Sequence, residues 1–541
     1  MSLKLREQVG CDVLVVGGGG AGLRAAIAAR AGRADVLLVS KYSTGRTTNT
    51  YISKAIIAAS GWGASEDGKD VHANDTVEGG RFLNDRAKVA VISERIVSEI
   101  AFLRECGVGF GMEGGKPRVI KIPGHRHARH LHGRNWTGGD LVLPLVERAK
   151  QAGVRFEDHW FVTRLLESDG AIAGAVGLAP DGTLVPIRAK AVVLATGGYS
   201  QVFLNTNNAP GITGDGLCLA YELGAALQDM ELVQFYPTAT GRRGSVLLLY
   251  EKLLAREESV LRNERGEDVL AKHGFPDPTR VTRDQLAQLV MKEIKDDPGG
   301  GRRIVMDLEA LPEEKARELS LFIPPAWWKG QKRFEVTPTA HFCMGGIATD
   351  RWGETSRSGL FAAGEVAAGA HGANRLGGNA LAEVFAMGSL VGAGAAERSS
   401  ETALRRIGRE RMEDEASRLN DMFSEQGVPP GELIRDLKTL MWRKVGIIRE
   451  KDGLQEALGR IREPWPRAAV RSPGDLTRLL EFQNMRLVSE MLCLAALRRT
   501  ESRGSHYRID HPGENSDEWL KNIVFRKGDS GMDVEVEPVS P

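Results

Sequence analysis

Three glycines near the start of this 541-residue chain have the spacing of a dinucleotide-binding fingerprint. They are Gly17, Gly19 and Gly22, in the order G-x-G-x-x-G. In such a turn the first glycine makes the bend, the second lets the backbone approach a pyrophosphate, and the third packs helix against strand. The pyrophosphate then lies at the N-terminus of the following helix. The run predicts a dinucleotide site, although a plain glycine turn has the same composition.

Charged residues elsewhere could bind a carboxylate or move a proton. Arg375 lies in the glycine-rich run His371–Asn379, where a guanidinium can hold a carboxylate through two parallel hydrogen bonds. Arg283 and Asp284 are adjacent, a pattern that is also typical of a solvated pair at a helix start. His341 on its own could be a satisfied core histidine. The residue types therefore favour a role for Arg375 and leave the other three open.

The elements that must position these residues follow from the apolar pattern. Cys11–Val16 and Asp35–Val39 are strand-like and flank the Ala-rich helical stretch Leu23–Arg30, which gives a βαβ unit around the glycines. Lys190–Ala195 and Gly359–Gly364 repeat the strand-to-glycine pattern. These segments predict an α/β protein with a Rossmann-like dinucleotide-binding domain.

The rest of the chain predicts an inserted domain and a helical domain. Glycine clusters become fewer between Gly241 and Pro338, where the sequence is charged and amphipathic, and helical runs follow Glu397. We expect the inserted domain to be an α+β cap, and the segment from Gly504 to lie over the surface as a tail. The predicted division is residues 1–235 and 340–400 for the dinucleotide-binding domain, 236–339 for the cap, 401–503 for the helical domain and 504–541 for the tail.

Composition excludes several classes of function. The chain has 72 Lys and Arg against 71 Asp and Glu, a net charge of +1, which argues against a bulk electrostatic role on nucleic acid or on an acidic membrane. Its five cysteines include no C-x-x-C pair, so neither the usual iron–sulfur ligand set nor a haem-attachment motif is present. No run approaches about 18 uninterrupted apolar residues, the length of a membrane span, and residues 1–10 contain no apolar signal core. We expect a cytoplasmic protein.

An ordered set of motifs resembles the flavoprotein subunits of fumarate reductase and succinate dehydrogenase, and L-aspartate oxidase, over nearly the whole chain. Ser40-Lys41 replaces the ribose-binding acid expected of an NAD site, and the resemblance implies FAD instead. The other motifs are Ala195–Gly198, Thr213–Gly216, Pro338–His341, Met344–Gly346, Gly364-Glu365, His371–Asn379 and Glu501–Arg508.

The resemblance implies a role for each matching residue. It implies hydride transfer at flavin N5, with Arg283 as proton donor or acceptor paired with Asp284. It places His341 and Arg375 on one substrate carboxylate, with Tyr236 and His132 also at the substrate. The FAD-binding residues it implies are Gly17, Gly19 and Gly22 at the pyrophosphate, Ser40 and Lys41 beside the adenosine, Thr196, Gly197, Asp215 and Glu365 along the dinucleotide, and Asn379 and Leu381 against the isoalloxazine.

The chain departs from the family pattern at three places. Thr48 stands where complex-forming members attach FAD to a histidine, so we expect FAD to be bound non-covalently. Lys54-Ala55 replaces a Gly-Gly pair near the flavin. Tyr236 replaces the family's substrate histidine, and the neighbouring Thr-Glu is absent. Glu251 and Arg256 are weak candidates for a proton relay to Arg283, because their spacing differs from that of the family.

The run His125–His132 contains four histidines at spacings that could bind zinc. Its arginines oppose a cation, so we expect no metal site and instead expect His132 or a neighbour to line the pocket.

Three functions remain open. The first is an oxidoreductase that interconverts a CH–CH and a CH=CH bond next to a carboxylate, in fumarate, succinate or a urocanate-like acid. It would exchange electrons with a separate partner such as an iron–sulfur subunit. The second is an L-aspartate oxidase, which needs no electron-carrier subunit. The third is a catalytically silent flavoprotein, which the joint presence of Arg283, His341 and Arg375 disfavours.

Overall fold

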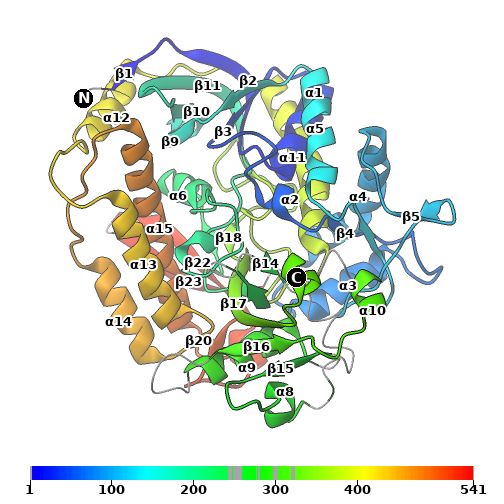
Figure 1. Ribbon diagram of the computed structural model, residues 1–541. Helices are drawn as coiled ribbons and strands as arrows, with labels where there is room; N and C mark the ends of the chain where they lie inside the picture. The colour runs from blue at the N-terminus through cyan, green and yellow to red at the C-terminus, as the bar shows by residue number, and fades with distance from the viewer. Residues whose placement is uncertain are drawn as a thin grey trace.

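The computed structural model describes residues 3–241, 246–247, 259–275, 277, 281–295, 303–318, 323–529 and 531–539. Its largest sheet carries the predicted βαβ unit and has eight strands (Figure 1). The α/β class predicted from the sequence is confirmed. The strand order is β8 (Arg155–Asp158), β3 (Val36–Ser40), β2 (Val9–Val16), β11 (Thr183–Leu194), β10 (Ala171–Leu178) and β9 (Phe161–Ser168), and β1 (Lys4–Leu5) and β19 (Leu360–Ala362) also pair with β11.

Strand β2 is apolar and buried at every position from Val13 to Val16. Such a continuous apolar run is typical of a strand whose sheet is covered on both faces. Val13 and Val15 face a core formed with helices α1, α5 and α11, whereas Leu14 faces a core that includes residues of α6, α13 and α15. The helices are α1 (Gly20–Ala31), α5 (Gly139–Gln151), α6 (Asp215–Glu222), α11 (Asn379–Glu401), α13 (Pro430–Val445) and α15 (Pro473–Arg498).

Helix α11 has the length and hydropathy of a membrane span, with a mean hydropathy of 1.2 over its most apolar window. However, 72% of that window is buried inside the protein, where the helix packs along α1 and against α4 (Arg86–Glu105). Its apolar composition therefore belongs to a core helix.

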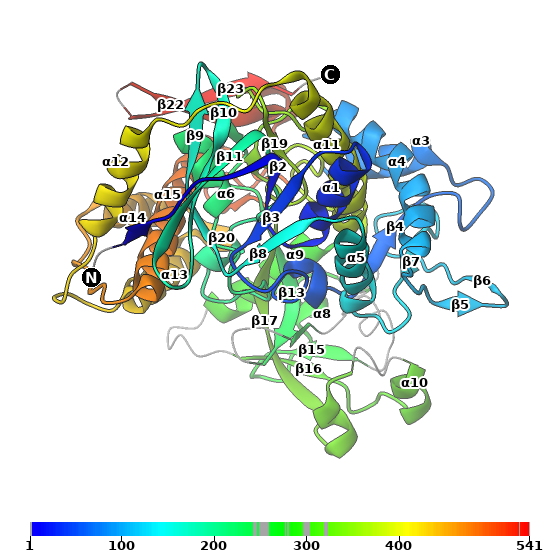
Figure 2. The same ribbon diagram turned by 90° about the horizontal axis from the view of Figure 1, so that it is seen from above.

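The region between Tyr236 and Thr339 forms a second sheet with its own core. This sheet has the order β14 (Val246–Leu247), β13 (Val233–Thr240), β17 (Arg333–Cys343), β16 (Ile304–Asp307) and β15 (Val260–Arg262). Tyr236 pairs with Thr339, so the predicted boundaries fall inside two paired strands. Figure 2 shows β15 and β16 of this sheet projecting from the rest of the molecule, whereas β13 lies within its outline. Its helices are α8 (Val269–Lys272), α9 (Arg283–Lys295), α10 (Glu313–Glu318) and η4 (Pro325–Lys329).

The C-terminal third contains helices α13, α15, α12 (Arg409–Asn420) and α14 (Lys451–Arg462). The prediction that the segment after Gly504 lies over the surface was wrong for β22 (Lys521–Gly528). This strand pairs with β12 (Leu227–Gln228), and its Ile523 and Phe525 are fully buried. The strand β23 (Gly531–Pro538) forms the outer edge, and β18 (Gly346–Ile347) completes the sheet.

Several shorter elements lie between residues 49 and 132. They are α2 (Asn49–Ile52), β4 (Ile56–Ala58), α3 (Lys69–Gly79), β5 (Met112–Glu113), β6 (Lys116–Pro117) and β7 (His130–His132). The remaining short elements are η1 (Ser200–Val202), β20 (Ile448–Arg449), β21 (Tyr507–Arg508) and α16 (Ser516–Trp519).

Candidate cofactor and substrate site

One cavity of about 810 Å³ joins the glycine turn to the predicted reaction residues. Its size lies in the range of small-molecule and cofactor pockets. Helices α1 and α11 both begin at its wall, and their N-termini favour negative charge there. The predicted residues that line it are Gly17, Gly19, Ser40, Lys41, Thr196, Gly197, Asp215, Tyr236, Arg283, His341, Glu365, Arg375 and Leu381.

The glycine turn has the geometry that a dinucleotide needs. Gly17 has φ of 123°, and a Cβ there would lie 2.2 Å from the carbonyl oxygen of Ala195. A Cβ on Gly22 would lie 1.9 Å from the carbonyl oxygen of Gly17, because helix α1 packs directly on the strand. At Gly19, in contrast, the nearest atom to a Cβ would be 3.8 Å away, which leaves space for a pyrophosphate beside the helix N-terminus.

Lys41, which lines the cavity, links three segments of the chain. Its Nζ lies 2.6 Å from Asp215 and 2.7 Å from Glu481, and it donates to Thr213 at 2.9 Å. Burial alone would lower the pKa of Lys41, but the two carboxylates raise it above its usual value. Asp215 also accepts from Asn484 on α15. The helical domain therefore closes this part of the site through a charge network.

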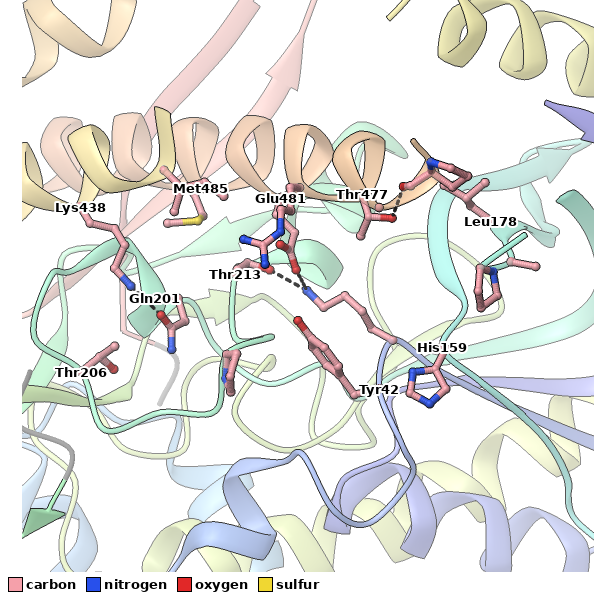
Figure 3. Close-up of a pocket in the computed structure, with 18 of the residues that line it drawn as sticks. Tyr42, His159, Leu178, Gln201, Thr206, Thr213, Lys438, Thr477, Glu481 and Met485 are labelled. Atoms are coloured by element: carbon pink, nitrogen blue, oxygen red, sulfur yellow. Dashed lines mark hydrogen bonds and ion pairs between the residues drawn. The ribbon is translucent and has the colours of Figure 1, made fainter. Parts of the chain in front are cut away.

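A second cavity of about 640 Å³ lies behind this network, between α13, α15 and residues 201–213 (Figure 3). Lys438 reaches Gln201 from α13, with Nζ 2.6 Å from Oε1. Gln201 in turn donates to the carbonyl oxygens of Asn208 and Ala209. Because Asn208 lines the first cavity, these contacts tie the helical domain to the wall of the site.

Glu365 lies at the middle of the cavity as a buried acceptor. It accepts from the backbone N–H of Cys343 at 3.1 Å and from Asn49 Nδ2 at 3.0 Å. Burial raises the pKa of Glu365 to about 7. The hydroxyl of Thr196, which also lines the cavity, is buried without a hydrogen-bond partner among the described residues. Both groups fit a ligand that carries hydroxyl and phosphate groups.

Arg375 is a buried cation at the far end of the cavity. It is 6% exposed, its Nη2 donates to Gln234 Oε1 at 3.0 Å, and its guanidinium lies 4.6 Å from the centre of the Phe342 ring. Its Nε is buried and finds no partner in the described part of the chain. Burial and the positive charge of Arg283 lower the pKa of Arg375 to about 9. An anion in the cavity would satisfy both the charge and the orphaned donor.

His341 stands beside Arg375 as a neutral imidazole. Burial and the charges of Arg375 and Arg283 hold the pKa of His341 well below its usual value. Its Nδ1 lies 3.2 Å from Asn207 Oδ1, and because an amide oxygen only accepts, Nδ1 carries the proton. An anion that offsets the two arginines would favour a second proton on Nε2.

Arg283 enters the cavity from the first turn of α9. Its guanidinium lies 5.3 Å from the centre of the Tyr236 ring, and that ring is 5.6 Å from His341 in an edge-to-face arrangement. Tyr236 is 2% exposed. The arginine, the phenol ring and the histidine therefore lie close together within one site.

The structure does not show the predicted pairing of Arg283 with Asp284. Between these two described residues there is no ion pair, because neighbours in a helix point in different directions. Asp284 does not line the cavity, its Oδ1 is buried with no partner among the residues that the structure describes, and burial raises the pKa of its carboxyl. Glu251 and Arg256, the candidate relay residues, lie outside the described residues.

Three other predicted residues lie behind the wall. Gly22 packs against Gly17. Asn379 binds His72 and Thr76 with its side chain, at 2.9 and 2.8 Å. His132 stacks on Trp136 at 3.7 Å and lies 2.9 Å from the carbonyl oxygen of Gly133. None of these three described residues lines the cavity.

The residues that replace the family pattern lie at the cavity wall. Thr48 lines it and caps α2, accepting from the backbone N–H of Tyr51. Lys54 also lines it, and burial lowers the pKa of its ammonium. Ala55 has φ of 54°, a left-handed conformation that favours glycine.

Sequence reasoning missed several polar residues of the site. Asn49, Asn207 and Asn208 line the cavity and hold Glu365 and His341 in place. Asn207 and Asn208 lie in the asparagine-rich segment Asn205–Asn208, a composition that more often marks a turn, and Asn49 stands alone in its segment. Glu481 is 440 residues from Lys41, and no local pattern connects the two.

These observations define the class of the protein as a flavoprotein oxidoreductase that binds FAD. A family model described as an FAD binding domain matches residues 12–381, and one described as the fumarate reductase flavoprotein C-term matches residues 434–541. The chain belongs to the family of fumarate reductase and succinate dehydrogenase flavoproteins, as its motifs predicted.

Named relatives span the whole chain. It is 32% identical to the fumarate reductase flavoprotein subunit of Mycobacterium tuberculosis (strain H37Rv), over 98% of this chain and 97% of that one. It is 32% identical to the fumarate reductase flavoprotein subunit of Escherichia coli, over 98% and 94%. A solved structure of Mycobacterium smegmatis Sdh1 in complex with UQ1 is 31% identical, with a TM-score of 0.88, over 100% of this chain and 95% of that one.

We expect the FAD to be released when the protein is denatured with acid or heat. Thr48 stands at the family's attachment position and has no nucleophilic nitrogen, and its hydroxyl caps α2. After precipitation and centrifugation, the flavin absorbance should be in the supernatant. Flavin that stays with the precipitated polypeptide after extensive washing would contradict this expectation.

The buried carboxyl of Glu365 should make the stability of the FAD-free protein depend on pH. Its pKa is about 7 in the folded protein against 4.5 for an ordinary glutamate, so the folded protein keeps a proton that the unfolded chain releases. Stability should therefore fall as pH rises from about 4.5 to about 7, by up to about 1.4 kcal/mol per pH unit, and then level off. Glu365→Gln stays neutral and should lack this contribution. If the free energies of unfolding of the two proteins, plotted against pH, run parallel from pH 5 to 8, the prediction is wrong.

Proposed function

We propose that the protein interconverts the CH–CH and CH=CH bonds next to the carboxylate of a small acid, with fumarate and succinate as the default pair. The observation that carries the proposal is the convergence of Arg375, His341 and Arg283 at one end of the cavity whose other end is the glycine turn. When bound, FAD supplies the acceptor and donor of hydride for this chemistry.

The protein's own residues bind the acid and move the proton. Arg375 holds a carboxylate, and the positive charge of this end draws electron density from an adjacent double bond. Arg283 gives a proton to the carbon beside the one that receives hydride, or takes it in the reverse direction. Its pKa in water exceeds about 12, so it acts by position rather than by acidity.

Tyr236 favours a second candidate, an acid with only one carboxylate. The family's histidine at this position is a potential cation, whereas a buried phenol is neutral at physiological pH. A urocanate-like or cinnamate-like acid has one carboxylate for Arg375 and a flat second group for the ring of Tyr236. His132, which lies behind the wall, would contribute to the site only indirectly.

Electrons would be exchanged with a partner of the iron–sulfur subunit kind. The relatives are named flavoprotein subunits, and among the five cysteines no pair has iron–sulfur spacing. A cytoplasmic protein that reaches a membrane only through its partner fits this arrangement. An L-aspartate oxidase would instead pass electrons from aspartate to oxygen without a partner.

A flavin-reoxidation screen separates these functions. The holoprotein is reduced anaerobically, and fumarate, urocanate and cinnamate are added separately while the flavin absorbance is followed. Rapid reoxidation by one of these acids supports the proposal and names the substrate class. If none reoxidises the flavin, and anaerobic L-aspartate reduces the oxidised protein, the function is that of an aspartate oxidase.

Tyr236→His should reveal which acid the native site prefers. It restores the family's residue at a position 2% exposed and in contact with His341. If the native substrate has one carboxylate, the variant should gain fumarate turnover by about tenfold, the effect of about 1.4 kcal/mol. Steady-state rates with fumarate and urocanate give the comparison. A loss of fumarate activity that the wild type already has would show that Tyr236 serves the dicarboxylate.

A further inference from the structure

Two buried histidines converge on one carbonyl group behind the cavity wall. His125 and His130 are 3% and 0% exposed, and their Nε2 atoms lie 3.0 and 3.1 Å from the carbonyl oxygen of Gly377. Their rings meet edge to face at 4.4 Å. Neither of these described rings lines the cavity, whereas Gly377 does. The histidines therefore hold the wall from behind.

The neighbours of His125 fix which of its nitrogens carries the proton. Arg129 is fully buried and lies 2.7 Å from Asp67 and 2.9 Å from Asp75. Its Nη1 is 3.5 Å from His125 Nδ1. Because a guanidinium can only donate, Nδ1 accepts, and Nε2 carries the proton that is donated to Gly377.

His130 stands between two carbonyl oxygens. Its Nδ1 lies 3.1 Å from the carbonyl oxygen of Ile120, and its Nε2 faces Gly377. Burial lowers the pKa of His125 to about 2 and that of His130 to about 4. Both rings are therefore neutral, and His130 has one proton to share between its two acceptors.

The held carbonyl determines where the next N–H points. The peptide between Gly377 and Gly378 is planar and trans, so its C=O and N–H groups point in opposite directions. With the oxygen directed at the histidines, the N–H of Gly378 is directed at the cavity, which both glycines line. It makes no hydrogen bond with the described residues. Helix α11 begins at the next residue, Asn379.

We propose that His125 and His130 are positioning residues that hold the Gly377 carbonyl so that the N–H of Gly378 is presented to the flavin ring of bound FAD. Leu381, which follows in the first turn of α11 and which the family resemblance places against the flavin ring, also lines the cavity. A fixed donor at the ring stabilises the negative charge that the ring gains on reduction more than it stabilises the neutral oxidised form. The same contacts fix the loop that carries Arg375.

The test compares the flavin midpoint potential and the FAD dissociation constant in the purified holoprotein and its variants. His125→Phe/His130→Phe removes both donors and keeps two rings. We expect the FAD dissociation constant to rise about tenfold. The two-electron potential should become more negative by about 30 mV, which is a tenfold change in the equilibrium constant of flavin reduction. His125→Gln/His130→Gln keeps an N–H donor at each position and should stay within twofold of the wild type. His127→Gln, a half-buried neighbour in the same segment, is the control.

A folded Phe double variant with the potential and FAD affinity of the wild type would overturn the proposal. If that double variant does not fold, each Phe single variant is measured instead. His125→Phe should then make the potential more negative by at least about 14 mV, which is a threefold change in the equilibrium constant of flavin reduction, because it removes the donor whose proton is fixed. Single variants that both match the wild type overturn the proposal equally. Neither measurement involves substrate, so the outcome is independent of the proposed reaction.

Discussion

Arg375→Ala should raise the KM for the unsaturated acid by about 10-fold to 100-fold while the protein stays folded and loaded with FAD. The substitution removes hydrogen bonds between a buried cation and a carboxylate, which contribute about 1.5–3 kcal/mol. It should not harm folding, since burial and Arg283 already make the charge of Arg375 costly in the empty site. Within the described part of the chain, the side chain donates one hydrogen bond, to Gln234. Substrate titration of the flavin absorbance and a thermal melt measure the two effects separately.

The pH dependence of the wild-type KM gives an independent check on the role of Arg375. The pKa of Arg375 is about 9 in the empty site, so the cation that holds the carboxylate is lost as pH rises through that value. The KM should therefore rise above about pH 9, and Arg375→Lys should keep part of the affinity without the bidentate geometry. An unchanged KM in Arg375→Ala would place the substrate elsewhere.

The sequence was sufficient for the parts of the site that depend on local spacing. The turn at Gly17, Gly19 and Gly22 could be predicted because three positions within six residues determine it. Arg375 could be singled out because it lies in a short glycine-rich run, whereas Glu365 was identified only because Gly364-Glu365 resembles a motif of the family. These positions, apart from Gly22, line one cavity in the structure.

What the sequence could not show depends on contacts between distant segments. The ion pair of Lys41 with Glu481 requires the fold to bring α15 onto the first domain. The sequence also could not show in which direction a side chain points. Asn379 is adjacent to cavity residues, yet its amide turns back to His72 and Thr76. The C-terminal strand β22 was missed because its apolar run, Ile523–Phe525, is only three residues long and lies in a segment that is otherwise rich in charged residues.

The histidine run shows how a pattern can be noticed and still be misassigned. His132 was expected at the pocket, but strand pairing with β4 places it beside Trp136. His125 and His130 instead meet the back of the loop that carries Arg375. Which histidine faces which group depends on the register of a three-residue strand, and that register cannot be read from spacing alone.

Arg283→Ala should lower kcat for the unsaturated acid by more than tenfold, a rise of more than about 1.4 kcal/mol in the barrier, while the FAD content stays normal. The structure explains why kcat should fall while the FAD content stays unchanged. Arg283 is half-buried in the first turn of α9, and the residues that anchor this helix in two cores, Leu286 and Val290 in one and Ala287 and Met291 in the other, are unchanged in the variant. At the cavity, however, its Nη2 is only 3.7 Å from the position that a Cβ on Gly377 would occupy. Rapid-mixing measurement of flavin reoxidation isolates the chemical step.

Two further variants separate a proton donor from a charge that merely attracts the acid. Arg283→Lys keeps the positive charge but replaces the planar guanidinium, which lies 5.3 Å from the centre of the Tyr236 ring, with a compact ammonium. If Arg283 acts by position, kcat should recover little while KM stays near that of the wild type. Asp284→Asn should have a small effect, because Asp284 neither lines the cavity nor pairs with Arg283 among the described residues. Full recovery of kcat in Arg283→Lys, or more than a tenth of wild-type turnover in Arg283→Ala, would mean that the proton comes from another group.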